Sequence, residues 1–335
     1  MNSIGESQRL YRCDRAYRVP ETSSPQFELV FQEIVNKEQP HLILAGRDYD
    51  VVFLAKYKQK VKLENCLIPV GDSDLACMML DKYETHLFSK KHNLPYVPTF
   101  LYRKREGMAG LEGFIEKYGF PLLVKPREGF ASHGVYIIRT REQLHNTLAD
   151  STEVMFQEYL SPPEKLAEME QDLRKGIPLF FSVPNSEHMV SQVVISKAGK
   201  ILSYISTKQN LVMGRTEYAK VYEDVKLNQM IEVFASKLAS LNWWGFLNLQ
   251  SRQDCNGDWK VFELNPRLSG ATSTRLCLGL DEIGLILSSE RPEWGIPVIE
   301  ENKENHVFKY LSDFTAKDID IQTFNKEGYW SHENS

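Results

Sequence analysis

The side chains that most clearly carry chemistry are three amides and one carboxylate, Asn248, Gln250, Glu263 and Asn265. We expect the segments 243–250 and 259–266, which contain them, to be two strands joined by a turn. The dipeptide Asn256-Gly257 between the segments is a strong signal for a two-residue hairpin turn, because both central residues of that turn need positive φ.

This turn fixes a register for the predicted hairpin. Cys255 faces Asp258, and counting back along both strands places Gln250 opposite Glu263. Residues two apart on a strand share a face, so all four polar side chains converge, with opposed Cβ atoms roughly 4.5–5.5 Å apart. The other face carries apolar residues suited to a core: Leu247, Leu249, Phe262 and Leu264.

A cluster of side-chain oxygens suits a hard cation. Magnesium takes oxygen ligands and completes its shell with substrate phosphates and water. Arg267 follows directly, and its planar guanidinium beside a metal suits a phosphate group. The alternative is the solvated polar face of an ordinary hairpin, and spacing alone leaves both interpretations open.

A second phosphate signal lies upstream. Lys125 ends the apolar segment 120–126, so a buried strand would deliver its ammonium to an exposed strand end. Small residues follow that let backbone amides approach phosphate oxygens: Gly129, Ala131, Ser132 and Gly134. The Walker pattern is absent, and a plain connection between strands is the alternative. We interpret His133 as a solvated loop residue.

The remaining periodicity predicts alternating helices and strands that position these residues. The expected helices cover 25–39, 50–58, 73–80, 81–92, 110–119, 141–148, 226–241 and 272–288. The expected strands cover 41–46, 66–70, 120–126, 134–140 and 154–160, with a hairpin formed by 189–196 and 200–207. A charged segment, 161–186, interrupts this order, and the tail from about 290 is polar.

Composition narrows the classes of function. The chain has 335 residues, 42% of them hydrophobic, and a formal net charge of −5, which argues against broad nucleic-acid or membrane binding. No segment reaches the roughly 18 apolar residues of a membrane span. The five cysteines show no CxxC spacing, which favours reduced thiols and a cytoplasmic protein and gives no support for zinc.

These motifs, in this order across roughly residues 40–285, resemble the ATP-grasp superfamily, and more closely its carbamoyl-phosphate-synthetase-like single-module carboxylate–amine ligases. The segments are LDKYETHLFSKKHNLPYVPTF, FPLLVKPREGFASHGV, VMFQEYL, WWGFLNLQ and FELNPRLSG. The resemblance implies an α/β protein with the ATP-grasp fold, two α+β lobes clasping ATP, after a short Rossmann-like domain truncated at its N-terminus. The implied domains are 1–80 (Rossmann-like), 81–160 (small lobe), 161–290 (large lobe with insertion 161–186) and 291–335 (tail).

The resemblance also implies roles for individual residues. Lys125 would bind the α and β phosphates, and the loop from Gly129 through Ser132 to Gly134 would cover the β and γ phosphates. Gln157, Glu158 and Leu160 would form the adenine hinge. Gln250, Glu263 and Asn265 would hold Mg²⁺, with Mn²⁺ as an alternative ion. Arg267 would stabilise the transferred γ-phosphoryl, which makes it and Lys125 the expected catalytic residues.

Further roles follow less directly from the resemblance. Lys208 and Arg215 match basic positions that face phosphates or substrate, and Ser269-Gly270-Ala271 would lie near the acyl acceptor. The ribose-binding glutamate is displaced by the insertion, so Glu187 or Glu164 fills that place, and we favour Glu187 because a predicted strand follows it. Gln157 departs from a position that is often acidic, and the short N-terminal domain lacks its first strand and helix.

The implied reaction activates a carboxylate as an acyl phosphate and passes it to an amine, with ADP and phosphate as products. A small-molecule kinase of the same fold and a catalytically silent nucleotide-binding regulatory protein are the alternatives. The expected partners are small-molecule carboxylates and amines, without nucleic acid or membrane, and a homodimer is one compatible state. The sequence does not identify the carboxylate or the amine.

Overall fold

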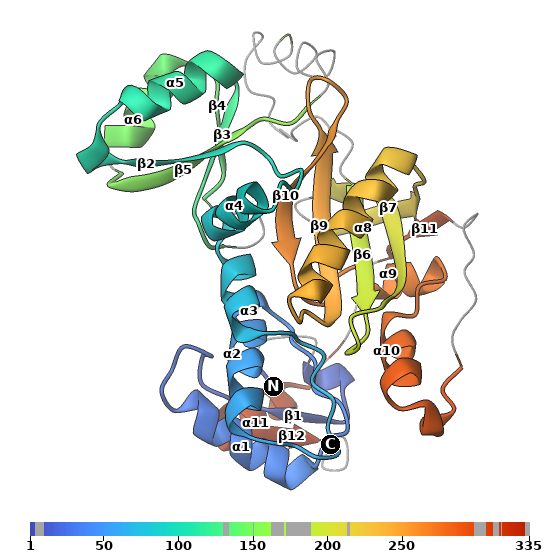
Figure 1. Cartoon of the computed structure of the whole chain (residues 1–335). Coiled ribbons are helices and arrows are strands. Elements are labelled where there is room, and N and C mark those ends of the chain that lie inside the picture. Colours follow the sequence, from blue (N-terminus) through green and yellow to red (C-terminus); the bar gives the residue numbers. More distant parts are fainter. Residues whose placement is uncertain are drawn as a thin grey trace. The chain divides into compact units, whose positions relative to one another are not determined.

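The computed structural model describes residues 1–3, 10–129, 134–149, 151–161, 171, 189–212, 215–297, 306–310, 315 and 317–331 (Figure 1). By its internal contacts the chain divides into two compact units. The first comprises residues 1–43, 60–68 and 310–335, and the second comprises 44–59 and 69–309. The expected lobe boundaries stay a prediction.

The first unit joins the two ends of the chain. Strand β1 (Arg15–Tyr17) pairs antiparallel with β12 (Tyr329–Ser331), and the unit also holds α1 (Phe27–Glu38) and α11 (Asp318–Glu327). Its core contains the buried residues Leu10, Tyr11, Ala16, Phe324 and Trp330. The polar tail therefore contributes a strand and a helix to this unit.

The first two expected strands, 41–46 and 66–70, are wrong as strands. They meet in one isolated parallel bridge, Leu42 with Leu67, supported by the bond from the Ile43 N–H to the Leu67 carbonyl at 2.9 Å. With so few hydrogen bonds between them, the segments 41–46 and 66–70 do not form a sheet among the described residues. A Rossmann-like arrangement for this region stays a prediction.

The second unit contains a four-stranded antiparallel sheet. Its order is β2-β5-β3-β4, with β2 (Thr99–Arg103), β3 (Leu122–Lys125), β4 (Tyr136–Ile138) and β5 (Glu153–Glu158). Helices α5 (Ala109–Tyr118) and α6 (Arg141–Ala149) bury Leu111 and Leu144 against it. The predictions of β3, β4 and β5 are confirmed, and β2 was not predicted.

The second unit also contains a six-stranded antiparallel sheet, ordered β10-β9-β6-β7-β8-β11. The strands are β6 (Met189–Ile195), β7 (Ile201–Val212), β8 (Arg215–Val221), β9 (Gly245–Gln253), β10 (Trp259–Asn265) and β11 (His306–Phe308). Helix α8 (Val225–Ser240) covers one face (Figure 1), and Leu247 and Leu249 of β9 are fully buried. The predicted hairpins and this helix are confirmed, and β8 and β11 were not predicted.

The predicted two-residue turn of the β9–β10 hairpin is wrong, yet the register at its far end is right. Asp254, and not Cys255, faces Asp258, because Gly257 adopts φ +78 and closes a three-residue loop. This displaces the pairing by one residue. A β-bulge between Val261 and Glu263 then adds one residue back, so the two deviations cancel beyond it.

The remaining helices follow the predicted pattern with one correction. Helices α2 (Asp48–Lys60), α3 (Ser73–Leu80) and α4 (Lys82–Lys91) form as expected. The single helix predicted over 272–288 is wrong. It divides into α9 (Thr272–Cys277) and α10 (Glu282–Glu290), because Gly279 has φ +90 and Asp281 caps the second helix through the Gly284 N–H.

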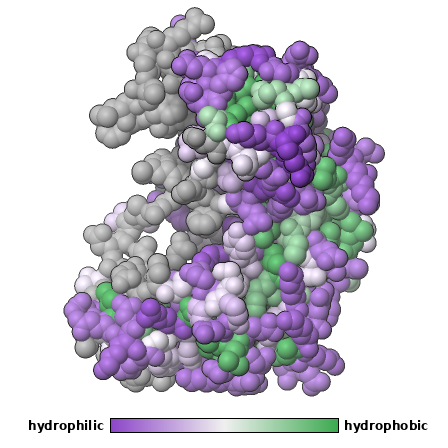
Figure 2. Space-filling model, turned by 90° about the vertical axis from the view of Figure 1, so that its left-hand side faces the viewer, coloured by the Kyte–Doolittle hydropathy of each residue, from purple (hydrophilic) through white to green (hydrophobic). Residues whose placement is uncertain are grey.

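Among the helices of the described residues, none is both long and apolar enough to cross a membrane. Figure 2 shows one face of the molecule, on which the coloured residues mix hydrophilic and hydrophobic types.

Candidate nucleotide and metal site

The polar face predicted for the β9–β10 hairpin is present. Glu263 pairs with Gln250, and Asn265 pairs with Asn248. The face is not an ordinary solvated one, because Asn265 and Asn248 are only 6% and 1% exposed. Asn248 donates its amide N–H to the Gln192 side-chain oxygen at 2.9 Å, so a third strand, β6, extends the polar face.

Three oxygen-bearing side chains on this face are uncommitted. Within the described part of the chain, Gln250, Glu263 and Asn265 make no side-chain hydrogen bond or ion pair, and Asn248 is held by Gln192. Only one of the three is a carboxylate. No group of three or more His, Cys, Asp or Glu side chains able to hold a metal occurs among the described residues. This donor set fits a Mg²⁺ ion that takes further ligands from phosphates and water.

Lys125 lies beside this face although it comes from the other sheet. Its side chain is 5% exposed, and its ammonium donates to the Phe262 carbonyl at 3.3 Å. The ammonium is also 5.6 Å from the centroid of the Phe262 ring. Burial lowers the pKa of Lys125 to about 7, nearby Glu263 raises it, and Lys82 and Arg252 lower it further.

The chain directly after Lys125 is anchored by two side-chain contacts. Lys82 donates to the Gly129 carbonyl at 3.1 Å, and Arg127 forms an ion pair with Asp81 at 2.6 Å. Gly134 has φ +73, a conformation that favours glycine. Ser132, like Ala131 and His133, lies outside the described residues, so the predicted phosphate contacts of this loop stay a prediction.

The predicted adenine hinge is the end of β5. Gln157 is fully buried and donates to the Thr99 hydroxyl at 3.0 Å, while its side-chain oxygen has no hydrogen-bond partner among the described residues. Glu158 is half-buried. The pKa of Glu158 is raised, mainly because burial disfavours the charged carboxylate and also because the negative charge of Asp254 is near. The positive charges of Lys260 and Lys117 act in the opposite direction. Leu160 is 3% exposed. A buried acceptor without a partner is suited to a ligand that donates a hydrogen bond.

Arg267 is held by a residue far away in sequence. Its Nε and one terminal nitrogen each lie 2.8 Å from an oxygen of Asp48, the first residue of α2. Its other terminal nitrogen donates to the Leu268 carbonyl at 3.1 Å. Both charged side chains are 18% exposed.

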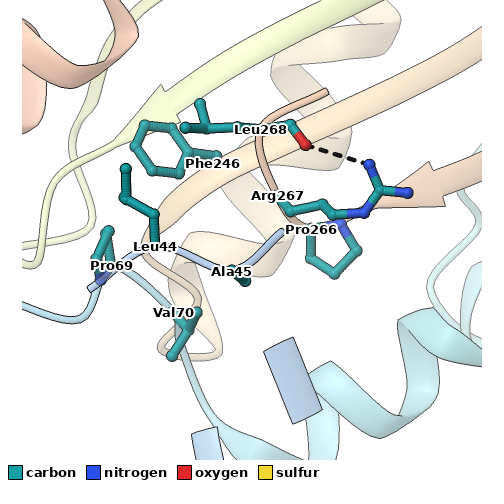
Figure 3. Close-up of a pocket in the computed structure, with 8 residues that line it drawn as sticks. All are labelled: Leu44, Ala45, Pro69, Val70, Phe246, Pro266, Arg267 and Leu268. Carbon is teal, nitrogen blue, oxygen red and sulfur yellow. Dashed lines mark hydrogen bonds between the residues drawn. The ribbon is translucent and has the colours of Figure 1, made fainter. Parts of the chain in front are cut away.

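A small pocket of about 10 Å³ lies beside Arg267, close to the smallest volume that holds one water molecule (Figure 3). It is lined by Leu44, Ala45, Pro69, Val70, Phe246, Pro266, Arg267 and Leu268. The guanidinium of Arg267 points away from this lining, and the other side chains drawn in Figure 3 are aliphatic or aromatic. The pocket is therefore an apolar one, and the Arg267 guanidinium is not part of it.

Of the residues predicted less directly, some lie among the described side chains and others do not. Lys208 is half-buried on β7, between Met189 of β6 and Lys220 of β8. Arg215 begins β8, but its side chain is outside the described residues, as are Glu164 and Glu187. Ser269 of the expected acceptor segment accepts a hydrogen bond from Arg275 at 3.0 Å, and the pair Arg275–Glu282 is fully buried.

Arg252 and Phe262 lie next to this site, although the sequence pattern did not indicate either of them. Phe262 was assigned to the core face, but the bulge leaves it half-buried, with the Arg252 guanidinium 5.6 Å from its ring centroid. The Arg252 Nε is buried and has no hydrogen-bond partner among the described residues. Arg252 lies two residues after Gln250 on the same strand. Because residues two apart share a face of the sheet, this spacing is the signal that could have identified Arg252.

Comparisons with solved structures place this arrangement in a known fold. The biotin carboxylase domain dimer of the Hydrogenobacter thermophilus 2-oxoglutarate carboxylase, solved with ADP, its magnesium salt and bicarbonate, has 12% identity and a TM-score of 0.62, covering 86% of this chain and 63% of that one. An ADP complex of N5-carboxyaminoimidazole ribonucleotide synthetase has 13% identity and a TM-score of 0.61, covering 86% and 68%.

A third neighbour is the N5-carboxyaminoimidazole synthetase from Staphylococcus aureus, solved with ADP. It has 14% identity and a TM-score of 0.60, covering 81% of this chain and 64% of that one. The chain thus spans about two thirds of the length of these neighbours. No protein-family model matches the sequence, and no curated protein matches it. The neighbours are ATP-grasp enzymes, and the chain has the ATP-grasp fold.

Proposed function

We propose that this protein is an ATP- and Mg²⁺-dependent ligase. It phosphorylates a carboxylate with ATP and joins the resulting acyl phosphate to an amine, releasing ADP and phosphate. Structural neighbours solved with ADP support the use of ATP, and a neighbour solved with the magnesium salt of ADP supports the use of magnesium. Because the sequence identities are 12–14%, the reaction rests on this chain's own residues.

One observation carries the proposal: Lys125 and Glu263 come from different sheets and lie close enough to interact electrostatically. A buried lysine beside one carboxylate and two uncommitted amides, Gln250 and Asn265, combines cationic and oxygen ligands within one site. A polyphosphate with its metal needs both kinds of group. In a purely structural ion pair the lysine would bond the carboxylate, but here it bonds the Phe262 carbonyl at 3.3 Å.

Each group has a defined task in this reaction. Glu263, Gln250 and Asn265 would hold Mg²⁺, which neutralises charge on the phosphates and polarises the transferred phosphoryl group when bound. Lys125 binds phosphate oxygens. Gln157 accepts a hydrogen bond from the adenine with its buried, unpartnered oxygen. Arg267 balances the charge that develops as the phosphoryl moves to the carboxylate.

The acyl phosphate makes amine attack feasible, because a carboxylate alone is a poor electrophile and phosphate is a good leaving group. Water has to be kept from this intermediate, since hydrolysis would waste it. We expect the loop through Ser132 to close over the distal phosphates, and Glu187 to bind the ribose. The segment Ser269-Gly270-Ala271 is where we expect the amine to approach.

The proposal is tested by incubating the protein with Mg²⁺, ATP and pooled carboxylates and amines, and by following ADP release. Active pools are divided until one acid and one amine remain, and the product is identified by mass. We expect an amide, formed in step with ADP and phosphate. A phosphorylated product without ligation would identify a kinase instead. Failure to bind ADP with Mg²⁺ would identify a protein without this chemistry.

A further inference from the structure

The Asp48–Arg267 pair uses only part of the arginine. A guanidinium has five N–H groups in one plane. Asp48 accepts from Nε and one terminal nitrogen, both at 2.8 Å, and the Leu268 carbonyl accepts from the other terminal nitrogen at 3.1 Å. Three of the five are committed, which leaves one N–H on each terminal nitrogen.

The geometry of these bonds determines where the remaining pair lies. Asp48 occupies the edge that includes Nε. The bond to Leu268 comes from the other terminal nitrogen, and the Leu268 oxygen approaches that nitrogen from the side of the arginine stem (Figure 3). The two remaining N–H groups therefore lie at the far end of the guanidinium, side by side. This is the arrangement that a phosphoryl or carboxylate group engages with two oxygens.

Several features separate this pair from an ordinary surface ion pair. Exposed pairs contribute little and adopt many geometries. Here both side chains are 18% exposed, both carboxylate oxygens are used, and the partners are 219 residues apart. The residues on either side of Arg267, Pro266 and Leu268, line a small apolar pocket with Leu44 and its neighbours. The guanidinium plane is thus held by Asp48 along one edge and by the Leu268 carbonyl at the other terminal nitrogen.

We propose that Asp48 is a positioning residue for Arg267. It holds the guanidinium so that the last two N–H groups face the transferred phosphoryl and the oxygen of the acid that accepts it. This inference rests on the proposed function, because it assigns Arg267 to the transferred group. Asp48 itself does not contact the substrates.

The test measures ADP binding with Mg²⁺, with and without aluminium fluoride, a planar mimic of the phosphoryl in transfer. In the wild-type protein, aluminium fluoride should tighten ADP binding, because the mimic engages the free pair of N–H groups. Asp48→Asn removes the negative charge and replaces one of the two acceptor oxygens with an NH2 group, which donates. We expect the ratio of the ADP dissociation constants without and with aluminium fluoride to fall by at least about tenfold in this variant. The affinity for ADP alone should change less than about twofold.

Two further variants make the result specific. Asp50→Asn is the matched control in the same turn of α2: Asp50 accepts from the Arg47 backbone N–H at 2.9 Å, and an amide oxygen can replace it there. It should keep the wild-type tightening. Asp48→Glu restores the charge and should recover part of it. A thermal melt of each variant checks folding, and Asp48→Glu keeps the test valid if Asp48→Asn does not fold.

The possible results separate failure of the Asp48 role from failure of the proposed ligase function. Wild-type tightening that persists in Asp48→Asn would overturn the positioning role and leave the ligase proposal intact. Tightening lost equally in Asp50→Asn would also overturn it, since any change in this turn would then suffice. A wild-type protein that does not bind ADP with Mg²⁺ would overturn the ligase proposal and this inference together.

Discussion

Lys125 donates its ammonium N–H to the backbone carbonyl of Phe262, 3.3 Å away, and so joins the end of β3 to the strand that carries Glu263. The carbonyl is available because the β-bulge at this point interrupts the pairing between β10 and β9. A bulge beside a candidate site thus directs a backbone acceptor toward the lysine. This acceptor compensates in part for burying the ammonium.

The first prediction concerns the buried Lys125 in protein free of metal and nucleotide. Its pKa is about 7 in the folded protein against 10.5 for a free lysine, because burial disfavours the charged form. Below pH 7 the lysine is protonated in both states, and the full cost of burial is present. Between about pH 7 and 10.5 the unfolded state binds more protons, so the free energy of unfolding contributed by this group rises with pH.

Lys125→Met should therefore flatten the pH dependence of the free energy of unfolding between pH 7 and 10. It should also raise the apo melting temperature at pH 7 by at least about 2 °C. Lys104→Met, at an exposed position beside β2, is the matched control and should keep the wild-type slope. A wild-type slope in Lys125→Met, measured by urea unfolding at several pH values, would contradict this account.

The second prediction is that Mg²⁺ and nucleotide bind together. Glu263 is the one carboxylate in the proposed metal set, and a single carboxylate with two amides holds Mg²⁺ weakly without phosphate oxygens. Calorimetric titration with millimolar Mg²⁺ alone should give no resolved binding. Addition of ADP should produce it, and EDTA should weaken ADP binding by at least about tenfold. Tight Mg²⁺ binding without nucleotide would place the metal elsewhere.

The third prediction assigns Glu263 itself. Glu263→Gln keeps the shape of the side chain and removes its charge, so we expect a folded protein that loses turnover and the Mg²⁺ dependence of ADP binding. Asp258→Asn makes the same kind of change at the tip of this hairpin and should behave as wild type. Normal Mg²⁺ dependence in Glu263→Gln would remove it from the metal site.

The fourth prediction concerns Arg252, whose buried Nε has no partner among the described residues. We expect a nucleotide to supply an acceptor, so Arg252→Met should weaken ADP binding by at least about tenfold, the value of one charge-assisted hydrogen bond. Lys260→Met, at the position paired with Arg252, is the control and should change affinity little. Equal effects of both changes would point to general charge instead of a specific contact.

The fifth prediction separates chemistry from binding at Arg267. Arg267→Ala should lower kcat by about 10³-fold or more, as loss of a phosphoryl-transfer arginine does, with a much smaller change in ATP affinity. Arg267→Lys should not restore the rate, because an ammonium cannot donate to Asp48 and to a ligand in the same plane. A large loss of ATP affinity with an unchanged kcat would assign Arg267 to binding.

Parts of the site followed from the sequence because local rules govern them. Alternation along β9 and β10 placed Gln250 opposite Glu263, and the apolar segment ending at Lys125 predicted β3. The register was right for a wrong reason, since the three-residue loop and the bulge at Phe262 shift the pairing in opposite directions. Neither deviation has a signal strong enough to compete with the Asn256-Gly257 pattern.

Other features depend on contacts between distant segments and could not be predicted. Nothing in the sequence near Asp48 indicates that it bonds Arg267, because the two are 219 positions apart. Strand β2 was missed because its segment follows two prolines, and the pairing with β5 that stabilises it is 58 residues away for Thr99 and Gln157. Arg252 was overlooked because a lone arginine on a strand is more often solvated than buried.

The central claim is that the substrate carboxylate attacks the γ-phosphorus of ATP and is thereby activated. Once a substrate acid is identified, it is labelled with ¹⁸O in the carboxylate and allowed to react with ATP, Mg²⁺ and the amine. The nucleotide product and the phosphate or pyrophosphate are then separated and analysed by mass. The account predicts ADP, with one ¹⁸O atom from the acid transferred to inorganic phosphate. AMP carrying the ¹⁸O, with pyrophosphate, would show attack at the α-phosphorus and contradict it.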